Sequence, residues 1–220
     1  MAYRVRVWDL PTRIFHWVLA ACVIGLVVTA KAGAMLWHER LGSAVLALLL
    51  FRIVWGLVGG HWSRFRTFVY APASVVAYLR GRAHPDHLIG HTPLGAASVF
   101  AMLLVLAAQV GTGLVSDDEI SFTGPLNRFI STDAGLAATT YHRSIGQWLV
   151  IGLVVLHIAA IAWYAWRKRQ NLVRPMIAGD KEVGEEARSA RDDLATRVLA
   201  AVLLAACGAA TWWIVGLGNG

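Results

Sequence analysis

The sequence predicts an all-α membrane protein, a helical bundle that crosses the bilayer several times. Hydrophobic residues make up 57% of the 220 residues, and charged residues make up only 15%. Long apolar stretches alternate with short charged segments, which is typical of polytopic membrane proteins because a crossing helix needs about 20 mainly apolar residues. A soluble protein of this composition would have too little polar surface to stay in solution.

Five stretches are long and apolar enough to cross the membrane. They lie near residues 14–32, 38–58, 93–115, 142–166 and 195–217. We expect the first four to form a four-helix core within residues 1–179, and residues 180–220 to supply a polar linker and a fifth, C-terminal span. The basic residues before the first stretch also suit a signal peptide, but its apolar core is long for one, so we expect a retained span.

A further segment, residues 71–81, is too short to span and has a mildly amphipathic pattern. Such a helix lies along the membrane surface, with its apolar face buried at the headgroup boundary. We therefore expect a short interfacial helix between the second and third spans.

Lysines and arginines gather in alternate connections. They precede the first span (Arg4, Arg6, Arg13), separate the second from the third (Arg64, Arg66, Arg80, Arg82) and follow the fourth (Arg167, Lys168, Arg169, Arg174, Lys181, Arg188, Arg191). The other two connections offer only Lys31 and Arg128. By the positive-inside rule, the N-terminus is cytoplasmic and the C-terminus is outside. Because membrane topology explains the net charge of +7, we expect the lipid bilayer and no nucleic acid as a partner.

Four histidines fall in the spans, two toward each face of the membrane: His16 and His157 on the cytoplasmic side, His38 and His142 on the outer side. A single histidine at an interface is commonly a snorkelling polar residue, but a symmetric set of four favours a function. His142 and His157 are 15 positions apart, which is roughly 22 Å along a helix and roughly 60° around it. Both can face the bundle interior, yet no single metal ion can bind both.

Haem suits this geometry, because it is flat, largely apolar and ligated by imidazoles from opposite sides. We therefore predict two haems, one held by His16 with His157 and the other by His38 with His142.

Other residues near these positions suit the same cofactor. Arg52, a cation inside a span, is predicted to pair with a propionate of the cytoplasmic haem, and snorkelling to the headgroups is the alternative. Arg13 and Arg143, each beside or close to a ligand candidate, are candidates for the same role. Gly42 and Gly146 each lie one turn from an outer histidine, where they make room for a porphyrin edge or, equally well, for close helix packing.

Six motifs, taken in order, resemble those of the bacterial cytochrome b561 family, which includes the cytochrome b subunits of nickel–iron hydrogenases. The motifs are VWDLPTRIFHW, HERLG, LLLFRIVWGLVG, YLRG, GHTPLG and RKRQNLVRPMIAG. The resemblance runs from about Val5 to Gly179 and implies a four-helix core in the bacterial inner membrane. It also implies two b-type haems that move electrons across the membrane, commonly to or from quinone. The ligand histidines of the family match His16, His38, His142 and His157.

The resemblance also implies a quinone pocket on the cytoplasmic side, near the GHNP motif of relatives. This chain has Gly90-His91-Thr92-Pro93 at that place, so threonine replaces asparagine. Thr92 can still donate a hydrogen bond, but its shorter side chain reaches less far.

These patterns favour a two-haem electron carrier whose small-molecule partner is quinone. An acidic outer loop, with Asp117, Asp118, Glu119 and Asp133, is either a steering surface for a basic periplasmic c-type cytochrome or a plain solvated loop. Two roles remain open: a membrane anchor for a dehydrogenase such as hydrogenase, or a quinone-linked oxidoreductase that acts alone. A histidine-relay transporter is less expected, because the spans offer only a thin polar track of Gln109, Thr112 and Gln147.

Overall fold

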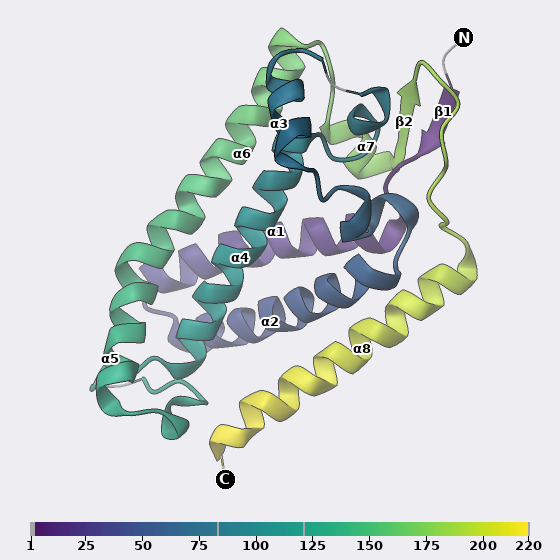
Figure 1. Ribbon diagram of the computed structural model, residues 1–220. Coiled ribbons are helices and arrows are strands. Elements are labelled where there is room, and N and C mark those ends of the chain that lie inside the picture. Colours follow the sequence, from purple (N-terminus) through teal and green to yellow (C-terminus); the bar gives the residue numbers. More distant parts are fainter. Residues whose placement is uncertain (1–2, 83, 121, 220) are drawn as a thin grey trace. The chain divides into compact units, whose positions relative to one another are not determined.

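The computed structural model describes residues 3–82, 84–120 and 122–219. Among these residues, five helical segments are long and apolar enough to cross a membrane (Figure 1). They are α1 (Leu10–Lys31), α2 (Met35–Val58), α4 (Pro93–Val115), the segment Thr132–Arg167 and α8 (Leu194–Gly216). The prediction of a helical membrane bundle with five spans is confirmed.

Helix α1 begins four residues earlier than predicted. The carboxylate of Asp9 accepts a hydrogen bond from the backbone nitrogen of Thr12 (2.8 Å), which caps the first turn. Pro11 suits this first turn, because a backbone N–H there would have no partner within the helix. The sequence WDLPT therefore starts the helix, whereas hydropathy alone detects only its apolar part.

The fourth spanning segment consists of α5 (Thr132–Thr140), a π-helical turn η5 (Tyr141–Gly146) and α6 (Gln147–Arg167). It starts at Thr132, ten residues earlier than predicted, and is capped by Ser131, whose hydroxyl accepts a hydrogen bond from the nitrogen of Ala134 (3.4 Å). A π-helical turn contains one extra residue per turn and is uncommon. Hydropathy does not detect it, and the sequence analysis missed it.

The shorter elements lie in the connections. Strands β1 (Tyr3–Arg6) and β2 (Asp180–Val183) pair antiparallel, with Tyr3 opposite Val183. Helix α3 (Pro72–Leu79) matches the short helix expected within residues 71–81. Helix α7 (Val173–Ala178) is followed by Gly179, which caps its C-terminal end with a φ of 92° that suits glycine. Short 3₁₀ turns are η1 (His61–Ser63), η2 (Phe65–Thr67), η3 (Pro85–Leu88), η4 (Asn127–Phe129) and η6 (Leu217–Asn219).

The chain divides into two compact units, and each of the five long segments contributes residues to both. The first unit contains the described residues up to His16 together with Arg52–Ala101 and Val155–Ala201. The second contains Trp17–Phe51, Met102–Val154 and the described residues from Val202 onward.

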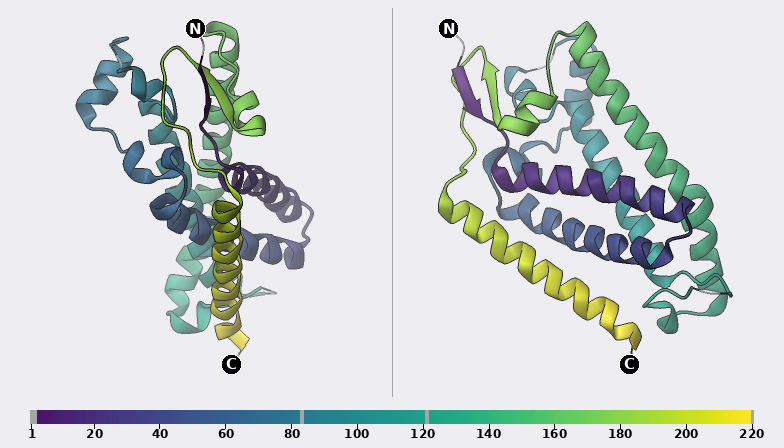
Figure 2. Two further views of the ribbon diagram at one scale, coloured as in Figure 1. Left: turned by 90° about the vertical axis from the view of Figure 1, so that its right-hand side faces the viewer. Right: turned by 180° about the vertical axis from the view of Figure 1, so that it is seen from behind.

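In the first unit, β1 lies beside the segment that precedes α8 (Figure 2), and a small core joins the two. Its buried residues are Val5, Val7, Trp8, Trp62, Ile89 and Ala190. The backbone nitrogen of Ala190 donates to the carbonyl of Arg6 (2.6 Å), and a guanidinium nitrogen of Arg6 lies 2.5 Å from the carboxylate of Asp192. We call β1, β2 and residues 190–193 the clasp. The polar linker expected after residue 179 is thus partly ordered by pairing with the N-terminus.

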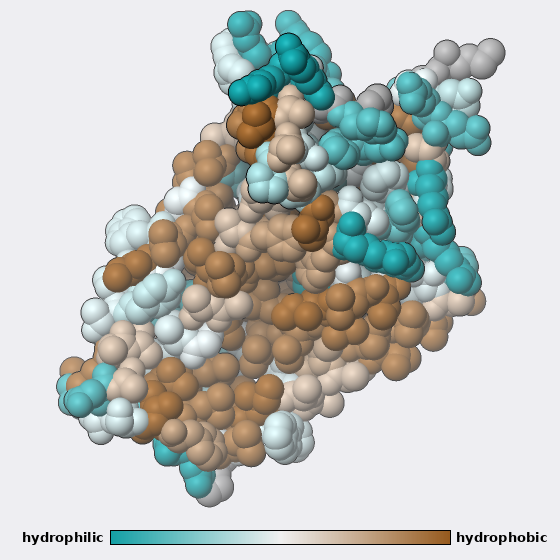
Figure 3. All heavy atoms as spheres, viewed as in Figure 1, coloured by the Kyte–Doolittle hydropathy of each residue, from teal (hydrophilic) through white to brown (hydrophobic). Residues whose placement is uncertain are grey.

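Hydrophobic side chains cover the long helices on the face shown in Figure 3, whereas hydrophilic side chains gather around β1, β2 and the connections near α3. Leu104 and Trp212, for example, are 72% and 80% exposed. Apolar surface of this extent is unfavourable in water and suits the hydrocarbon core of a bilayer. The distribution agrees with membrane insertion.

Candidate functional site

The first unit brings together His16 from α1 and His157 from α6. Their ring centroids are 6.3 Å apart, and their ring planes are inclined by 53°. Both side chains are half-buried. The sequence analysis paired these two histidines because the predicted topology places both toward the cytoplasmic side of the membrane.

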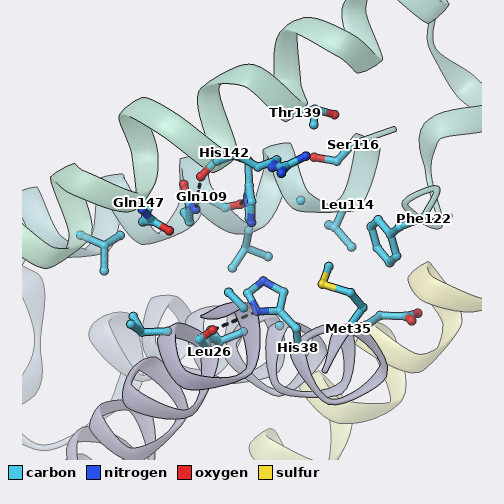
Figure 4. Close-up of a pocket in the computed structure, with 18 of the residues that line it drawn as sticks. Leu26, Met35, His38, Gln109, Leu114, Ser116, Phe122, Thr139, His142 and Gln147 are labelled. Carbon is cyan, nitrogen blue, oxygen red and sulfur yellow. Dashed lines mark hydrogen bonds between the residues drawn. The ribbon is translucent and has the colours of Figure 1, made fainter. Parts of the chain in front are cut away.

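The second unit brings together His38 from α2 and His142 from the π-helical turn. Their ring centroids are 6.0 Å apart, with planes at 84°. Figure 4 shows the two rings pointing toward each other across a cavity. This is the second pair that the sequence analysis expected.

Both separations suit two imidazoles bound to one iron. Metal–nitrogen bonds of about 2 Å on opposite sides of an ion place the ring centroids about 6 Å apart. Among the described residues, no group of three or more His, Cys, Asp or Glu side chains is placed to hold a metal ion. The macrocycle of haem supplies four ligands of its own, so two imidazoles from the protein would complete the coordination of its iron. The residues present therefore fit haem.

Hydrogen bonds fix the ring orientation of both histidines in the second unit. Nδ1 of His38 lies 3.0 Å from the carbonyl oxygen of Leu26, and Nδ1 of His142 lies 2.8 Å from that of Gln109. Because a carbonyl only accepts, each Nδ1 carries the proton and each Nε2 keeps its lone pair for a metal. Metal-bound histidines commonly donate their other N–H in this way.

A threonine hydroxyl lies beside each of these two carbonyls, in the same manner on two helices. Thr29 and Thr112 each donate at 2.7 Å to the carbonyl four residues earlier, and their Oγ1 atoms also lie 3.2 Å and 3.1 Å from the carbonyl oxygens of Leu26 and Gln109. Each Oγ1 is also 3.4 Å from Nδ1 of the corresponding histidine. The sequence analysis missed these contacts, for which the only signal is a threonine on a helix face next to a histidine-bearing helix.

The cavity between His38 and His142 has a volume of about 430 Å³, within the usual range for cofactor sites. Gly42 lines it, and a Cβ added there would meet nothing within 4 Å, so open space lies beside this glycine. A Cβ at Gly113 would come within 3.0 Å of the His142 ring, so the lack of a side chain at this glycine makes room for the imidazole.

Gly146 has different surroundings from Gly42. A Cβ there would lie 1.9 Å from Oε1 of Gln109, so the space beside this glycine holds a glutamine side chain rather than room for a porphyrin edge. Close packing, the other interpretation left open for this glycine, is the one that the structure supports.

The three candidate arginines have different surroundings. Arg143 is exposed and lines the cavity of the second unit. Arg13, in the first unit, donates from Nη1 to the carbonyl of Ile177 (2.5 Å) and lies 3.8 Å from the carboxylate of Asp192, so its guanidinium is engaged by the clasp.

Arg52 is only 3% exposed, which disfavours snorkelling to the headgroups. Its guanidinium carbon lies 4.5 Å from the ring centroid of Phe65, and its Nη1 has no hydrogen-bond partner among the described residues. A buried cationic N–H without a partner is costly, so this position suits an anionic group such as a carboxylate.

A buried carboxylate, Asp9, organises the same unit. It is 0% exposed and accepts hydrogen bonds from the hydroxyl of Ser63 (2.8 Å) and the indole of Trp55 (3.3 Å), in addition to its capping bond. The sequence analysis assigned WDLPTR to the start of the helix, but it did not predict that Asp9 ties α1 to α2 and to the connection after α2.

His91 and Thr92, the candidates for a quinone pocket, also lie in the first unit. The His91 ring stacks between Trp8 and Phe68, with centroid distances of 4.7 Å and 4.3 Å. Burial and the nearby positive charge of Arg52 lower the pKa of His91 to about 3. Nδ1 of His91 has no hydrogen-bond partner within the part of the chain that is described.

Thr92 caps α4 by accepting a hydrogen bond from the nitrogen of Gly95 (3.2 Å). It also hydrogen-bonds with Tyr78, whose hydroxyl contacts that of Tyr164. Burial, followed by the bond with Tyr164, raises the pKa of Tyr78 to about 12. The hydroxyl of Thr92 thus belongs to a small group of hydroxyls from α3, α4 and α6.

A bundle of spanning helices with two facing imidazole pairs defines a membrane haem protein. The sequence model of the family Prokaryotic cytochrome b561 matches residues 7–179, and the chain belongs to this family. It is therefore a b-type cytochrome of a bacterial membrane, and its function is electron transfer through haem b.

Several relatives are named probable Ni/Fe-hydrogenase B-type cytochrome subunits. The one from Bradyrhizobium diazoefficiens is 25% identical, over 81% of this chain and 86% of the relative. That from Cupriavidus necator is 26% identical, over 79% and 85%. The corresponding hydrogenase 1 subunit of Escherichia coli K12 is 26% identical, over 69% and 80%. No solved structure matches the chain.

Proposed function

We propose that the chain carries electrons across the bacterial inner membrane through two b-type haems, one held by His16 and His157 and the other by His38 and His142. The observation that carries the proposal is that two separate imidazole pairs have the centroid separations, 6.3 Å and 6.0 Å, that suit a shared iron. When bound, haem supplies one-electron chemistry. The chain supplies ligation, a buried site and fixed ring orientations.

Charged residues complete the two sites in this proposal. Arg52 pairs with a haem propionate in the first unit, because its unpartnered Nη1 is buried and a guanidinium binds carboxylates well. Arg143 has the same role at the cavity of the second unit, which it lines. Arg13 is engaged by the clasp, so any contribution to a propionate is shared with Ile177 and Asp192.

The orientation and the division of the chain follow from the sequence. The arginines and lysines concentrated in alternate connections support a cytoplasmic N-terminus and a periplasmic C-terminus. Residues 1–179 form the di-haem core, and residues 180–220 add the remainder of the clasp and the fifth span. The family match, which covers residues 7–179, supports this division.

Quinone is the proposed small-molecule partner, at His91 and Thr92. The support is a cluster of three side-chain hydroxyls, those of Thr92, Tyr78 and Tyr164, because hydroxyls donate hydrogen bonds to quinone carbonyls. A periplasmic partner, such as a basic c-type cytochrome, exchanges electrons at the outer site. Acting in this way, the chain is an independent quinone-linked oxidoreductase.

A second candidate function is favoured by the relatives. Those relatives are named cytochrome subunits of Ni/Fe-hydrogenases, so the chain is alternatively the membrane anchor of a hydrogenase-like dehydrogenase. Purification from mild detergent separates the candidates. A dehydrogenase subunit that co-purifies in fixed ratio supports the anchor, whereas quinone reduction by the isolated chain supports the independent oxidoreductase.

Haem stoichiometry tests the proposal. A pyridine haemochrome assay on the purified chain is expected to give two b-type haems per chain. His157→Ala and His38→Ala are each expected to remove one haem, because each breaks one pair. His84→Ala is the matched control, since His84 is exposed beside Asp86 and should leave both haems bound. A wild-type chain with a single haem, or a His157→Ala chain with two, contradicts the proposed ligands.

A further inference from the structure

The ligand candidate His142 lies in the π-helical turn, an irregular part of an otherwise α-helical segment from Thr132 to Arg167. Such turns are rarer than α-helical ones and frequently occur at functional sites. Compared with a regular α-helix, such a turn changes the direction of the side chains and backbone groups around His142. The contacts of His142 and Gly146 show how neighbouring residues hold the turn.

Gln109 of α4 contacts His142 twice. Its backbone carbonyl accepts from Nδ1 of the imidazole at 2.8 Å, and its side-chain Nε2 donates to the His142 carbonyl, also at 2.8 Å (Figure 4). One residue therefore holds both the ring and the backbone of the ligand candidate. Oε1 of Gln109 is buried and has no hydrogen-bond partner among the described residues.

Gly146, the last residue of the turn, is required for this contact. A Cβ at position 146 would lie 1.9 Å from Oε1 of Gln109 and 2.9 Å from Cε1 of Tyr141. Only glycine lets the amide of Gln109 lie against this backbone. Gly152, further along the same helix, has nothing within 4 Å of an added Cβ and is the natural comparison.

The opposite histidine lacks this arrangement. Nδ1 of His38 is bonded to the carbonyl of Leu26, whose side chain is apolar and has no donor. The two histidines share one further feature, because a threonine hydroxyl lies 3.2 Å from the carbonyl of Leu26 and 3.1 Å from that of Gln109. The side chain of Gln109 is thus one feature that distinguishes His142 from His38.

We propose that Gln109 is a positioning residue that sets the reduction potential of the haem bound by His38 and His142. The inference rests on the proposed function. A hydrogen bond from Nδ1–H to a carbonyl raises the basicity of the imidazole. A more basic ligand favours the oxidised iron and lowers the potential. By fixing the His142 backbone, the Gln109 amide keeps Nδ1 close to its carbonyl partner.

The test is the substitution Gln109→Met in the full-length chain. Methionine keeps the approximate length of the side chain and removes the hydrogen-bond donor Nε2. Redox titration of the visible spectrum is expected to show two haems with one potential raised and the other unchanged. A change of about five-fold in the ratio of reduced to oxidised haem corresponds to about 40 mV for one electron. The low-spin electron paramagnetic resonance signal of the same haem should shift as well.

Gly146→Ala tests the same contact from the opposite side, because the added methyl displaces the Gln109 amide. It is expected to raise the reduction potential of the same haem. The potential of a chain that carries both Gln109→Met and Gly146→Ala should shift little more than that of either single variant, because both changes remove the same contact. Gly152→Ala, the matched control, should leave both potentials unchanged.

Two results overturn the inference. One is a Gln109→Met chain that binds two haems with both potentials and both resonance signals unchanged. The other is an equal shift of both haems, which indicates a general structural effect. A wild-type chain that binds no haem overturns the proposed function and this inference with it.

Discussion

In the first unit, some buried polar groups have hydrogen-bond partners among the described residues and others have none. Asp9 accepts hydrogen bonds from the backbone of Thr12 and from the side chains of Trp55 and Ser63. By contrast, within the described part of the chain, Nη1 of Arg52 and Nδ1 of His91 have no hydrogen-bond partner. Buried donors and acceptors are nearly always paired in folded proteins, so these two atoms mark where a cofactor, a ligand or water completes the site.

Acidification is expected to destabilise the first unit through His91. Burial and the charge of Arg52 lower its pKa to about 3, whereas an imidazole in the unfolded chain titrates near 6.5. As the pH falls, the unfolded state binds the proton first. The stabilisation is therefore complete above pH 6.5 and decreases by up to about 1.4 kcal/mol per pH unit between about 6.5 and 3. Thermal unfolding in detergent at pH 7 and pH 5 measures the effect.

His91→Phe is the informative variant for this pH dependence, because phenylalanine keeps the stacking between Trp8 and Phe68 and has no titrating group. Its unfolding temperature should depend less on pH than that of the wild type. His84→Ala, at an exposed position, should keep the wild-type slope. Equal slopes for His91→Phe and the wild type would show that another group causes the acid sensitivity.

At the scale of residues, the two histidine pairs could be predicted from the sequence, but their supporting contacts could not. Helix periodicity shows that His142 and His157 share a face, and topology shows which face of the membrane each approaches. The contacts of Gln109, Thr29 and Asp9 depend on which helices are neighbours and on a π-helical turn. A single sequence carries no direct signal for either.

At the scale of elements, the clasp joins segments 174 to 186 positions apart in the sequence. Asp192, whose side chain is 6% exposed, accepts hydrogen bonds from the backbone of Leu10 (3.1 Å) and from the guanidinium groups of Arg6 and Arg197. Burial alone raises its pKa, but the bonds from Arg197, Leu10 and Arg6 outweigh burial and lower it. The carboxylate therefore remains charged at neutral pH and holds β1 and the start of α1 to the segment before α8.

Asp192→Asn is expected to weaken the clasp by about 1–3 kcal/mol, because it removes the charge that accepts hydrogen bonds from Arg6 and Arg197, although Arg6 keeps its ion pair with Asp180. The expected results are a lower unfolding temperature and faster proteolysis within residues 184–189. Glu185→Gln, at an exposed position in the same segment, is the control and should change neither. If Asp192→Asn retains both the wild-type unfolding temperature and the wild-type cleavage rate, the ion pairs contribute little to holding this segment.

The elements were predictable where hydropathy defines them. The five spans and the short helix α3 follow from the lengths and patterns of the apolar stretches. Strand β2 was not predicted, because four residues of mixed polarity, Asp180–Val183, carry no strand pattern without the partner strand. The early starts of α1 and α5 depend on the capping residues Asp9 and Ser131 rather than on hydropathy.

At the scale of the whole molecule, the candidate site residues lie in the first part of the chain. All four ligand candidates precede residue 158, and the residues that line the cavity of the second unit precede residue 151. The family match ends at residue 179, whereas α8 begins at Leu194. These limits imply that haem binding and the fifth span are separable, although α8 buries Ala200, Cys207 and Thr211.

A chain that ends after residue 193 is therefore expected to bind two haems, because it keeps every ligand candidate, the cavity lining and the whole clasp. Its unfolding temperature should fall, since it loses the buried face of α8 and the contact of Arg128 with the carbonyl of Leu217 (3.3 Å). The matched comparison is a chain that ends after residue 179, which also loses β2 and Asp192 and should be less stable still. Haem stoichiometry and thermal unfolding of both chains measure these differences. Loss of one haem from the longer of the two would place α8 within a haem site and would contradict the division at residue 179.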